Sequence, residues 1–524
     1  MWPFTRKPEA PKAAGKQPQA RRPVRPSAKR YYAAAKKDRL TSGWGTGVVS
    51  ADAALCGDLE KLRARSRLLA ANDPYFRYSL KLARRNVVGA YGVRLQMKVV
   101  ERHDPDGSAV ADDLANRLIE EAWRDWGKRQ HCTVSKRMDF VAVQKLVLSS
   151  ALRDGEIFVR KIKGYEGNAY RFALQIIEAD HLDVGHNAAV AGNNTIRMGV
   201  EFNDWGEAVA YHFRERHPGD YLGSRHGSAR RVRIPAEQIL HVYDPERADQ
   251  TRGAPDSSAS MTRSNMLNGY EEAELVAARA ASGKMGFFTT PDGESYEGED
   301  AEYDEAGNET AVIAEADPGT FDELPEGYGF TPYDPQHPTT AFQPFVKTIL
   351  RGMASGMGVN YNLLANDYEG VNFSSLRQAN LNDRDGWKET QQWFVEQLHE
   401  QIFGDWLLMA LTSGQIALPA EKFDKFNKPA WRPRGWNWVD PLKEAGANRI
   451  NVDMGTDTLT SIAAEQGREI EEIFQERKSE ITLAKKYGIH LASGGGDAPP
   501  SDPPPPGEVD DNADNEDDAD AEEN

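Results

Sequence analysis

Cysteine and long apolar runs are both scarce in this sequence. Among 524 residues, only Cys56 and Cys132 carry thiols, too few for a disulfide framework or a zinc site. No apolar stretch approaches the roughly 18 to 20 residues that span a bilayer. The first residues, MWPFTRKPEAPKAAGKQ, place charge and proline where a signal peptide needs an apolar run. The sequence therefore predicts a chain with reduced thiols that is not secreted and has no membrane partner.

Recognised catalytic signatures are missing too. No G-x-x-x-x-G-K-[ST] phosphate loop occurs, and the glycines at 494–496 precede neither a lysine nor a helix. Ser355 lies one place away from a G-x-S-x-G pattern, and no histidine pair has zinc-protease spacing. His241, in QILHVYDPER, is expected to be a hydrogen-bonded structural histidine at a strand end. We expect no enzymatic activity, cofactor or metal, with one alternative left open: Asp367 and Glu369 could hold a catalytic metal, as in a nuclease.

Charge is distributed unevenly along the chain, whose formal net charge is −17. Residues 1–40 carry 12 Lys and Arg against Glu9 and Asp38, whereas residues 494–524 carry 12 Asp and Glu and no Lys or Arg. Both ends are expected to be disordered, the first as a basic arm and the second as an acidic tail. The arm suits nucleic acid or an acidic protein surface. The acidic body between the ends argues against tight DNA binding over a broad face.

The first half of the chain alternates helical and strand patterns. Helices are expected over residues 55–86, with Asp58 as a cap and a break at 72–74, and over residues 112–126 and 140–152. Runs of β-branched and aromatic residues indicate strands at 95–99, 157–160, 172–177, 200–202, 209–211 and 234–242, with a hairpin turn at 203–206. These patterns predict an α+β domain with an antiparallel sheet.

The second half is dominated by helices and one insertion. Helical patterns at 265–283 and 341–359 flank residues 291–327, which are dense in Asp, Glu, Gly and Pro. Gly352, Gly356 and Gly358 leave little bulk on one side of the second helix, which favours close helix–helix contact. Residues 374–410 carry one apolar face and predict a helix of roughly 55 Å. Helices at 447–454 and 461–487, with a turn at 465–468, close the ordered part.

A series of motifs occurs in a fixed order between about residues 55 and 491. It runs through RARSRLLAANDPYFRYSLKLARRNVVGAYGVRLQ, LRDGEIFVRKI, IIEADHL, GVEFNDWGEAVAYHF, IPAEQILHVYDPERADQTRGAP, YEEAELVAARAAS, ILRGMASGMGVNYNLLANDYEGVNFSSLR and WVDPLKEAGANRINVDMGTDTLTSIAAEQGREIEEIF. No single motif is decisive, but the ordered series is specific. It resembles the lambda-type portal protein family of tailed phages.

The resemblance implies a portal fold, an α+β architecture with a mainly helical stem and crown, an α/β wing and a small inserted clip. It assigns the basic arm to residues 1–40, the wing to 41–260, stem helices to 261–284 and 341–359, the clip to 285–340, the channel loop and long wing helix to 360–441, the crown to 442–492 and the acidic tail to 493–524. It places Asn366, Asp367, Tyr368, Glu369, Asn372 and Phe373 in the channel loop, Lys347 and Arg351 near the channel, and Gly352, Gly356 and Gly358 where stem helices pack.

The resemblance also implies a function without catalysis. Copies of the chain would form a dodecameric ring at one capsid vertex, nucleate head assembly, dock the packaging motor and conduct double-stranded DNA in and out. The implied partners are DNA, the terminase large subunit, the major capsid and scaffold proteins, and head-completion adaptors. The implied location is the virion, with the host cytoplasm during assembly. An acidic body fits a conduit, because an acidic wall repels phosphates and lets DNA slide.

Overall fold

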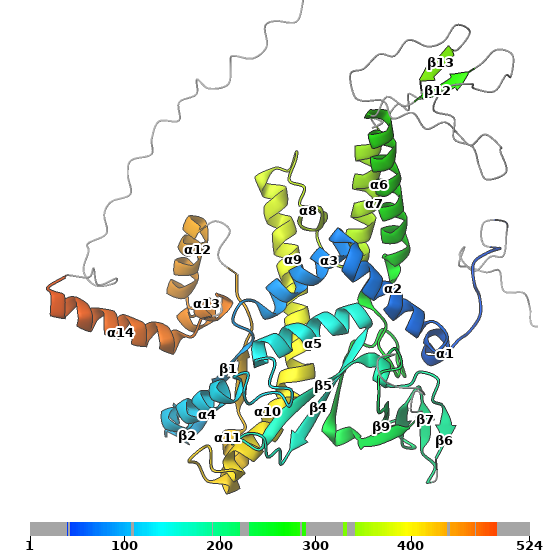
Figure 1. Cartoon of the computed structure of the whole chain (residues 1–524). Coiled ribbons are helices and arrows are strands. Elements are labelled where there is room, and N and C mark those ends of the chain that lie inside the picture. The colour runs from blue at the N-terminus through cyan, green and yellow to red at the C-terminus, as the bar shows by residue number, and fades with distance from the viewer. Residues whose placement is uncertain are drawn as a thin grey trace, which may run out of the picture. The chain divides into compact units, whose positions relative to one another are not determined.

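The structure is a computed structural model. It describes residues 39, 42–105, 109–190, 192–220, 230–282, 286–289, 329–332, 341–436, 441–466 and 468–489. The chain divides into two units, residues 1–50 and 51–524, and all described helices and strands belong to the second (Figure 1). The predicted arm apart from Arg39, the acidic insertion 291–327 and the acidic tail lie outside the described residues. Within the described part, no helix has both the length and the apolar character needed to cross a membrane.

The helices lie mostly where the sequence patterns predict them. Their bounds are α1 Ala51–Leu55, α2 Leu59–Asn72, α3 Pro74–Ala83, α4 Asp113–Trp126, α5 Phe140–Asp154, α6 Met261–Ser282, α7 Phe342–Gly356, α8 Tyr361–Ala365, α9 Phe373–Phe394, α10 Glu400–Thr412, α11 Phe423–Phe426, α12 Pro441–Asp453, α13 Leu459–Glu465 and α14 Ile470–Tyr487. The predicted break before α3 is confirmed, since the Asp73 carboxylate accepts a hydrogen bond from the Phe76 N–H and caps this helix. Asp58, by contrast, makes no side-chain cap hydrogen bond.

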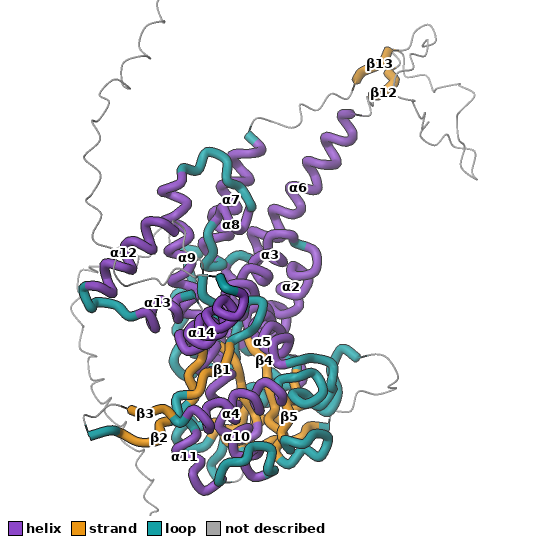
Figure 2. The backbone as a smooth tube through the Cα atoms, turned by 90° about the vertical axis from the view of Figure 1, so that its left-hand side faces the viewer, coloured by secondary structure: helices purple, strands orange, loops and turns teal. Residues whose placement is uncertain are grey.

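The strands form several small antiparallel sheets instead of one. Their bounds are β1 Arg94–Met97, β2 Val100–His103, β3 Ala109–Ala111, β4 Glu156–Lys163, β5 Phe172–Ile177, β6 Ala188–Ala189, β7 Thr195–Arg197, β8 Val200–Phe202, β9 Ala208–Arg214, β10 Arg231–Pro235, β11 Ile239–Tyr243, β12 Gly286–Thr289, β13 Gly329–Pro332 and β14 Pro429–Arg432. The orders are β11-β4-β5, β10-β9-β8-β7-β6, β1-β14, β2-β3 and β12-β13. Figure 2 shows β4 and β5 beside α5 and α10, which both contact the three-stranded sheet.

Two strand predictions need correction. Residues 234–242 were expected to form one element, but Pro235 ends β10, a short 3₁₀ turn at Ala236–Gln238 follows, and β11 then joins a different sheet. The reason is that proline cannot donate a ladder hydrogen bond, so the chain leaves the first sheet there. The sequence patterns also missed β14, which pairs with β1 so that Leu95 lies opposite Trp431. This segment is rich in Trp and Pro, and it forms a strand only because it pairs with β1.

The main hydrophobic core is aromatic. It joins α4, α5, α10, β4, β5 and the segment after α9, and it includes Trp126, Phe172 and Trp406, all fully buried. The Trp123 and Trp406 rings meet edge to face with centroids 4.8 Å apart, a favourable geometry for aromatic pairs. The Trp126 indole N–H donates to the Phe172 carbonyl at 3.0 Å. A second core connects α2 and α3 to α6, α7 and α8.

The long predicted helix is confirmed with one irregularity. Helices α9 and α10 are continuous through a π-helical turn, Val395–His399. Its apolar face carries Phe394, Leu398 and Ile402 into the main core. A π-turn adds one residue to the helical repeat, so it lets the apolar stripe keep facing the core along the full length.

Candidate functional site

Helices α6 and α7 form an antiparallel pair (Figure 1). The start of α6 meets the end of α7, where the Ser260 hydroxyl, just before α6, donates to the Met353 carbonyl at 3.2 Å. Farther along, the Tyr270 ring of α6 stacks on Phe342 at the start of α7, with centroids 5.7 Å apart. The predicted pair of long helices flanking an insertion is therefore present. The insertion's ends close in the β12–β13 ladder.

Two of the three predicted packing glycines face the start of α6. A Cβ atom on Gly352 would stand 2.2 Å from Arg263 Nη1, and one on Gly356 would stand 2.2 Å from Ser260 Oγ. At these two positions an added side chain would meet residues of α6 or of the segment just before it, within one chain. Gly358 differs: it lies beyond the last residue of α7, has a φ of +63°, and its added Cβ would meet nothing within 4 Å. Its role is to turn the chain, because residues with side chains rarely adopt that conformation.

The predicted loop residues and stem charges come together beside α7. The Lys347 ammonium lies 3.2 Å from Asp367 Oδ2 and 3.4 Å from Glu369 Oε2. Asp367 also accepts a hydrogen bond of 2.6 Å from the Tyr361 hydroxyl, and the Arg351 guanidinium lies over the Tyr361 ring, 5.3 Å from its centroid. The Tyr361 hydroxyl first, then the Glu369 N–H and then Lys347, hold the pKa of Asp367 below its ordinary value. The loop thus presents carboxylates whose charge is partly balanced by α7.

The other proposed loop residues shape its two ends. Asn366 ends α8 in the left-handed conformation with a φ of +53°, and the Asn372 side chain accepts from the Ser375 N–H at 2.7 Å, which caps α9. Tyr368 is exposed. Phe373 is exposed too but belongs to the first turn of α9 instead of the loop. The loop proper therefore covers residues 366–372, so that Phe373 lies outside it.

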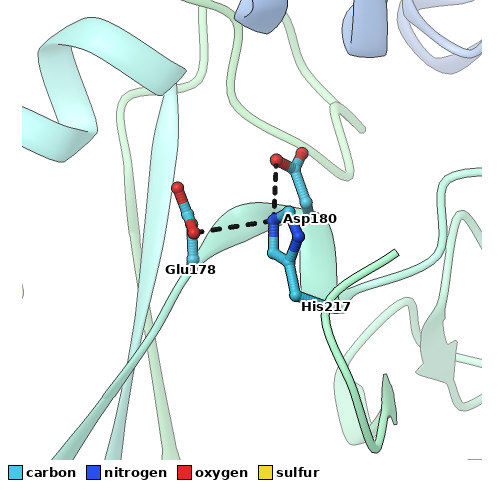
Figure 3. Close-up of side chains that lie close together, drawn as sticks. All are labelled: Glu178, Asp180 and His217. Atoms are coloured by element: carbon cyan, nitrogen blue, oxygen red, sulfur yellow. Dashed lines mark ion pairs between the residues drawn. The ribbon is translucent and has the colours of Figure 1, made fainter. Parts of the chain in front are cut away.

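The nuclease alternative finds no support in this geometry. A lysine ammonium stands between Asp367 and Glu369, where a divalent metal would have to bind. Among the described residues, the cluster of three potential metal ligands lies elsewhere, at Glu178, Asp180 and His217 (Figure 3).

That cluster already has its counter-charges. His217 Nε2 lies 3.6 Å from Glu178 and 3.5 Å from Asp180. The Asp180 carboxylate also pairs with Arg63 at 3.3 Å and with Arg67, and Glu178 pairs with Arg67 at 3.0 Å. Burial raises the pKa of Asp180, but Arg67 and Arg63 outweigh it and lower the pKa. Because two guanidinium groups occupy the carboxylates, the cluster is part of an ion network and not a vacant metal centre.

The centre of that network is a fully buried carboxylate that the sequence patterns missed. Glu156, at the start of β4, pairs with Arg63 of α2, with Arg252, and with His241 of β11 through a 2.7 Å contact. Burial raises the pKa of Glu156, but Arg252 and Arg63 outweigh it and hold the pKa well below its ordinary value. Burial also lowers the pKa of His241 against the pull of Glu156. His241 is hydrogen-bonded as expected, but it lies in the middle of β11 and not at a strand end.

Arg252 extends the network to the backbone. Its guanidinium donates to the carbonyls of Leu182 at 3.2 Å, Met198 at 2.8 Å and Ala179 at 3.2 Å. One side chain thereby connects β4 to the segment between β5 and β6 and to the turn between β7 and β8. The sequence did contain one signal, a glutamate directly before the apolar run Ile157–Val159. Burying a carboxylate at such a position costs free energy unless its charge is paired.

Comparison with known proteins identifies the class. Residues 37–391 match the family model described as phage portal protein, lambda family. The chain is 34% identical over 466 residues to the probable portal protein of Halomonas phage phiHAP-1, covering 88% of each chain. It is 23% identical over 478 residues to portal protein B of Escherichia phage lambda, covering 85% of this chain and 88% of that one. The neck of a native gene transfer agent particle, computed with C12 symmetry, covers 78% of this chain with 12% identity and a TM-score of 0.40.

Proteins of this class are structural components of the virion, at its head–tail connection, and not catalysts. The chain belongs to the lambda family of phage portal proteins. Its fold is α+β, as the sequence predicts.

Proposed function

We propose that copies of this chain close into a ring, twelve by resemblance to the family, and that double-stranded DNA passes through its centre during packaging and ejection. The observation that carries the proposal is membership of the portal family across residues 37–391. The α6–α7 pair supports it, because α6 leaves Met266, Leu275 and Val276 at least 62% exposed. Exposed apolar side chains favour burial against another surface, and a neighbouring copy in a closed ring supplies one.

The parts of the chain are assigned to the ring as follows. The wing comprises residues 41–260 together with the long helix in 360–441, whose aromatic face shares the main core with β4 and β5. The stem is the α6–α7 pair, residues 261–284 and 341–359, and the clip is the insertion 285–340 between them. The crown is the helical segment 442–492. The loop 366–372 faces the channel, since it is tied to the stem through Lys347.

Charge balance suits the passage of DNA. The loop contributes Asp367 and Glu369, and the one stem lysine beside them pairs with both. Phosphates are retained by uncompensated cations and repelled by carboxylates. A wall of this kind guides DNA without holding it.

The remaining partners follow from the position of the ring. The clip docks the terminase large subunit, the adaptors of head completion bind the assembled ring, and the major capsid and scaffold proteins surround it as it nucleates head assembly in the host cytoplasm. The basic arm, with 12 Lys and Arg in residues 1–40, contacts scaffold, capsid or DNA.

Negative-stain images of the purified chain test the ring. We expect top views with a central hole. Monomers alone, at high concentration and moderate salt, would overturn the proposal.

Deletion of residues 285–340 tests motor docking separately: rings should still form while heads stay empty, and normally filled heads would contradict docking at the clip.

A further inference from the structure

A basic groove lies at the end of α3, outside the elements assigned to the channel. It is a cavity of about 570 Å³ lined by Lys81, Arg84, Arg85, Gly89, Ala90, Lys145 and Arg434. The lining has basic residues and no carboxylate, which is unusual in a chain of net charge −17.

Local structure holds the groove open. A π-helical turn, Arg84–Val88, follows α3 and ends at Gly89, whose φ is +72°. Arg434 Nη1 donates to the Arg85 carbonyl and to Asn86 Oδ1, both at 2.7 Å. A Cβ on Gly89 would stand 3.1 Å from Arg434 Cβ. The backbone at Gly89 and the Arg434 side chain therefore pack closely against each other. This packing fixes the basic residues around them before any anion binds.

The charges of this groove are not balanced within the described part of the chain. Lys81, Arg84 and Lys145 form no ion pair with any described carboxylate. Burial, and then the neighbouring Arg384 guanidinium, lower the pKa of Arg434. Cations that face one another without a counter-ion repel, so a bound anion would relieve this repulsion.

We propose that the groove binds the chain's own acidic tail, residues 494–524. This tail carries 12 Asp and Glu with no Lys or Arg, so its charge is complementary to the groove. Asp and Glu accept hydrogen bonds from guanidinium groups in pairs and from ammonium groups singly. The groove combines both kinds of donor.

The tail can reach the groove. Glu469, just before α14, lines a second cavity together with Tyr91 and Val93, which directly follow Gly89 and Ala90 of the groove. Helix α14 has 18 residues, about 27 Å at the helical rise. The 35 residues after Ile489 can reach at most about 125 Å. The distance from the end of α14 back to its start is therefore within the ordinary reach of the tail.

A tethered anion also has an advantage over a free one. Attachment gives the tail an effective concentration in the millimolar range, whereas free DNA must approach an acidic molecule against its net charge. The tail is for this reason the favoured occupant, and it keeps the groove from retaining DNA.

Zero-length carbodiimide coupling of the intact chain tests the contact directly. This reagent joins a lysine amine to a carboxylate only where the two touch. We expect peptides from residues 494–524 coupled to Lys81 or Lys145, and loss of these products at about 0.5 M salt, where screening is strong. Coupling of the tail only to lysines outside the groove would overturn the proposal.

A second experiment uses binding of a short DNA duplex to the full-length chain. Replacing the tail's Asp and Glu with Asn and Gln should strengthen DNA binding about tenfold, since the groove is then vacant. Adding Lys81→Gln, Arg84→Gln and Lys145→Gln should abolish that gain. The matched control is Lys61→Gln, Lys388→Gln and Arg449→Gln, at positions whose side chains are 60% exposed or more, and it should keep the gain.

The outcomes separate the alternatives. If the groove triple and the control triple behave alike, the gain comes from net charge alone and the proposal is wrong. If DNA binds the groove equally well with the native tail, the groove is a nucleic-acid site and the proposal is also wrong. If the triple substitution in the groove lowers the melting temperature, Lys145→Gln is used alone in its place. We then expect this single substitution to remove at least half of the gain in DNA binding. Ring formation is unaffected in every arm, so failure here leaves the proposed function standing.

Discussion

His399 is fully buried in the π-helical turn, and neither of its ring nitrogens has a hydrogen-bond partner among the described residues. Its ring centroid lies 5.0 Å from that of Trp431 and 5.3 Å from that of Phe394. Burial lowers the pKa of the imidazole to about 3, against a weak backbone contact with Phe394. The folded protein therefore holds this histidine neutral in an aromatic core, and charging it requires the core to open.

The resulting pH dependence has a definite sign. The folded pKa lies below the unfolded value of about 6.5, so the unfolded state binds the proton first and stability falls as the pH drops below about 6.5. From about pH 7 to about pH 5 we expect His399 to cost up to about 2 kcal/mol of unfolding free energy. The variant His399→Leu should lack this loss. Denaturant titrations at both pH values measure the difference.

The matched control is His103→Leu, in the exposed part of β2, which should keep the acid sensitivity of the parent. If the pH dependence of His399→Leu runs parallel to that of the parent, the imidazole is not the source of the loss.

Arg252 offers a second test at this scale. It is fully buried and shares Glu156 with Arg63 and His241. Removing one member of a buried ion pair leaves charge uncompensated and costs about 3–5 kcal/mol. We expect Arg252→Met to lose that much unfolding free energy, while Arg449→Met, at a surface arginine that is 85% exposed, changes it little. A loss below about 1 kcal/mol for Arg252→Met would contradict the account.

Among the elements, those with strong local periodicity were predictable. The long helix, α4, α5 and the turn between β8 and β9 follow from residue spacing alone. The π-helical turn does not follow from residue spacing, because its extra residue depends on the aromatic core that it faces. Strand β14 was missed for a related reason: Trp431 becomes a strand residue by pairing with Leu95, more than 300 positions away in the sequence. Local patterns carry no information on such a partner.

The same limit applies to the candidate site. The glycines, the stem charges and the loop were named from motif order, whereas the pairing of Lys347 with Asp367 and Glu369 was not predicted. The Glu156 network was not identifiable, since its members come from α2, β4, β11 and the segment after β11. The local signals at Glu156 and His241 do not tell which charged groups meet them.

At the level of elements, Gly356 tests the α6–α7 contact. A side chain there meets Ser260 Oγ, which is buried and bonded to Met353. Overpacking of this kind costs about 1–3 kcal/mol. We expect Gly356→Leu to lose that much stability and to impair ring closure as a consequence, as measured by thermal unfolding and negative-stain images.

The control for this substitution is Gly446→Leu in α12, where an added Cβ meets nothing within 4 Å. It should not be destabilised, because leucine is the better helix former. A Gly356→Leu chain that is as stable as the parent and forms rings as readily would disprove the packing argument.

For the whole molecule, the distribution of charge is the property most directly tied to DNA passage. The chain has a net charge of −17, with a strongly basic first segment and an acidic last one. Within the body, Lys347 of α7 pairs with the loop carboxylates Asp367 and Glu369. Assembly into a ring multiplies whatever charge each copy presents at the axis, so a small change per chain becomes a large change in the field that DNA meets.

Reversal of the loop charge therefore gives the clearest prediction at this scale. With Asp367→Lys and Glu369→Lys, Lys347 loses both partners and each copy gains cations that retain phosphates. We expect rings of normal appearance but heads that stall with short genomes, measured as the length of protected DNA per particle. The control is Glu101→Lys with Glu121→Lys, two exposed wing positions with the same change in net charge, and its heads should fill. If both pairs fill their heads equally, the loop does not face the DNA; if both stall, net charge and not position is responsible.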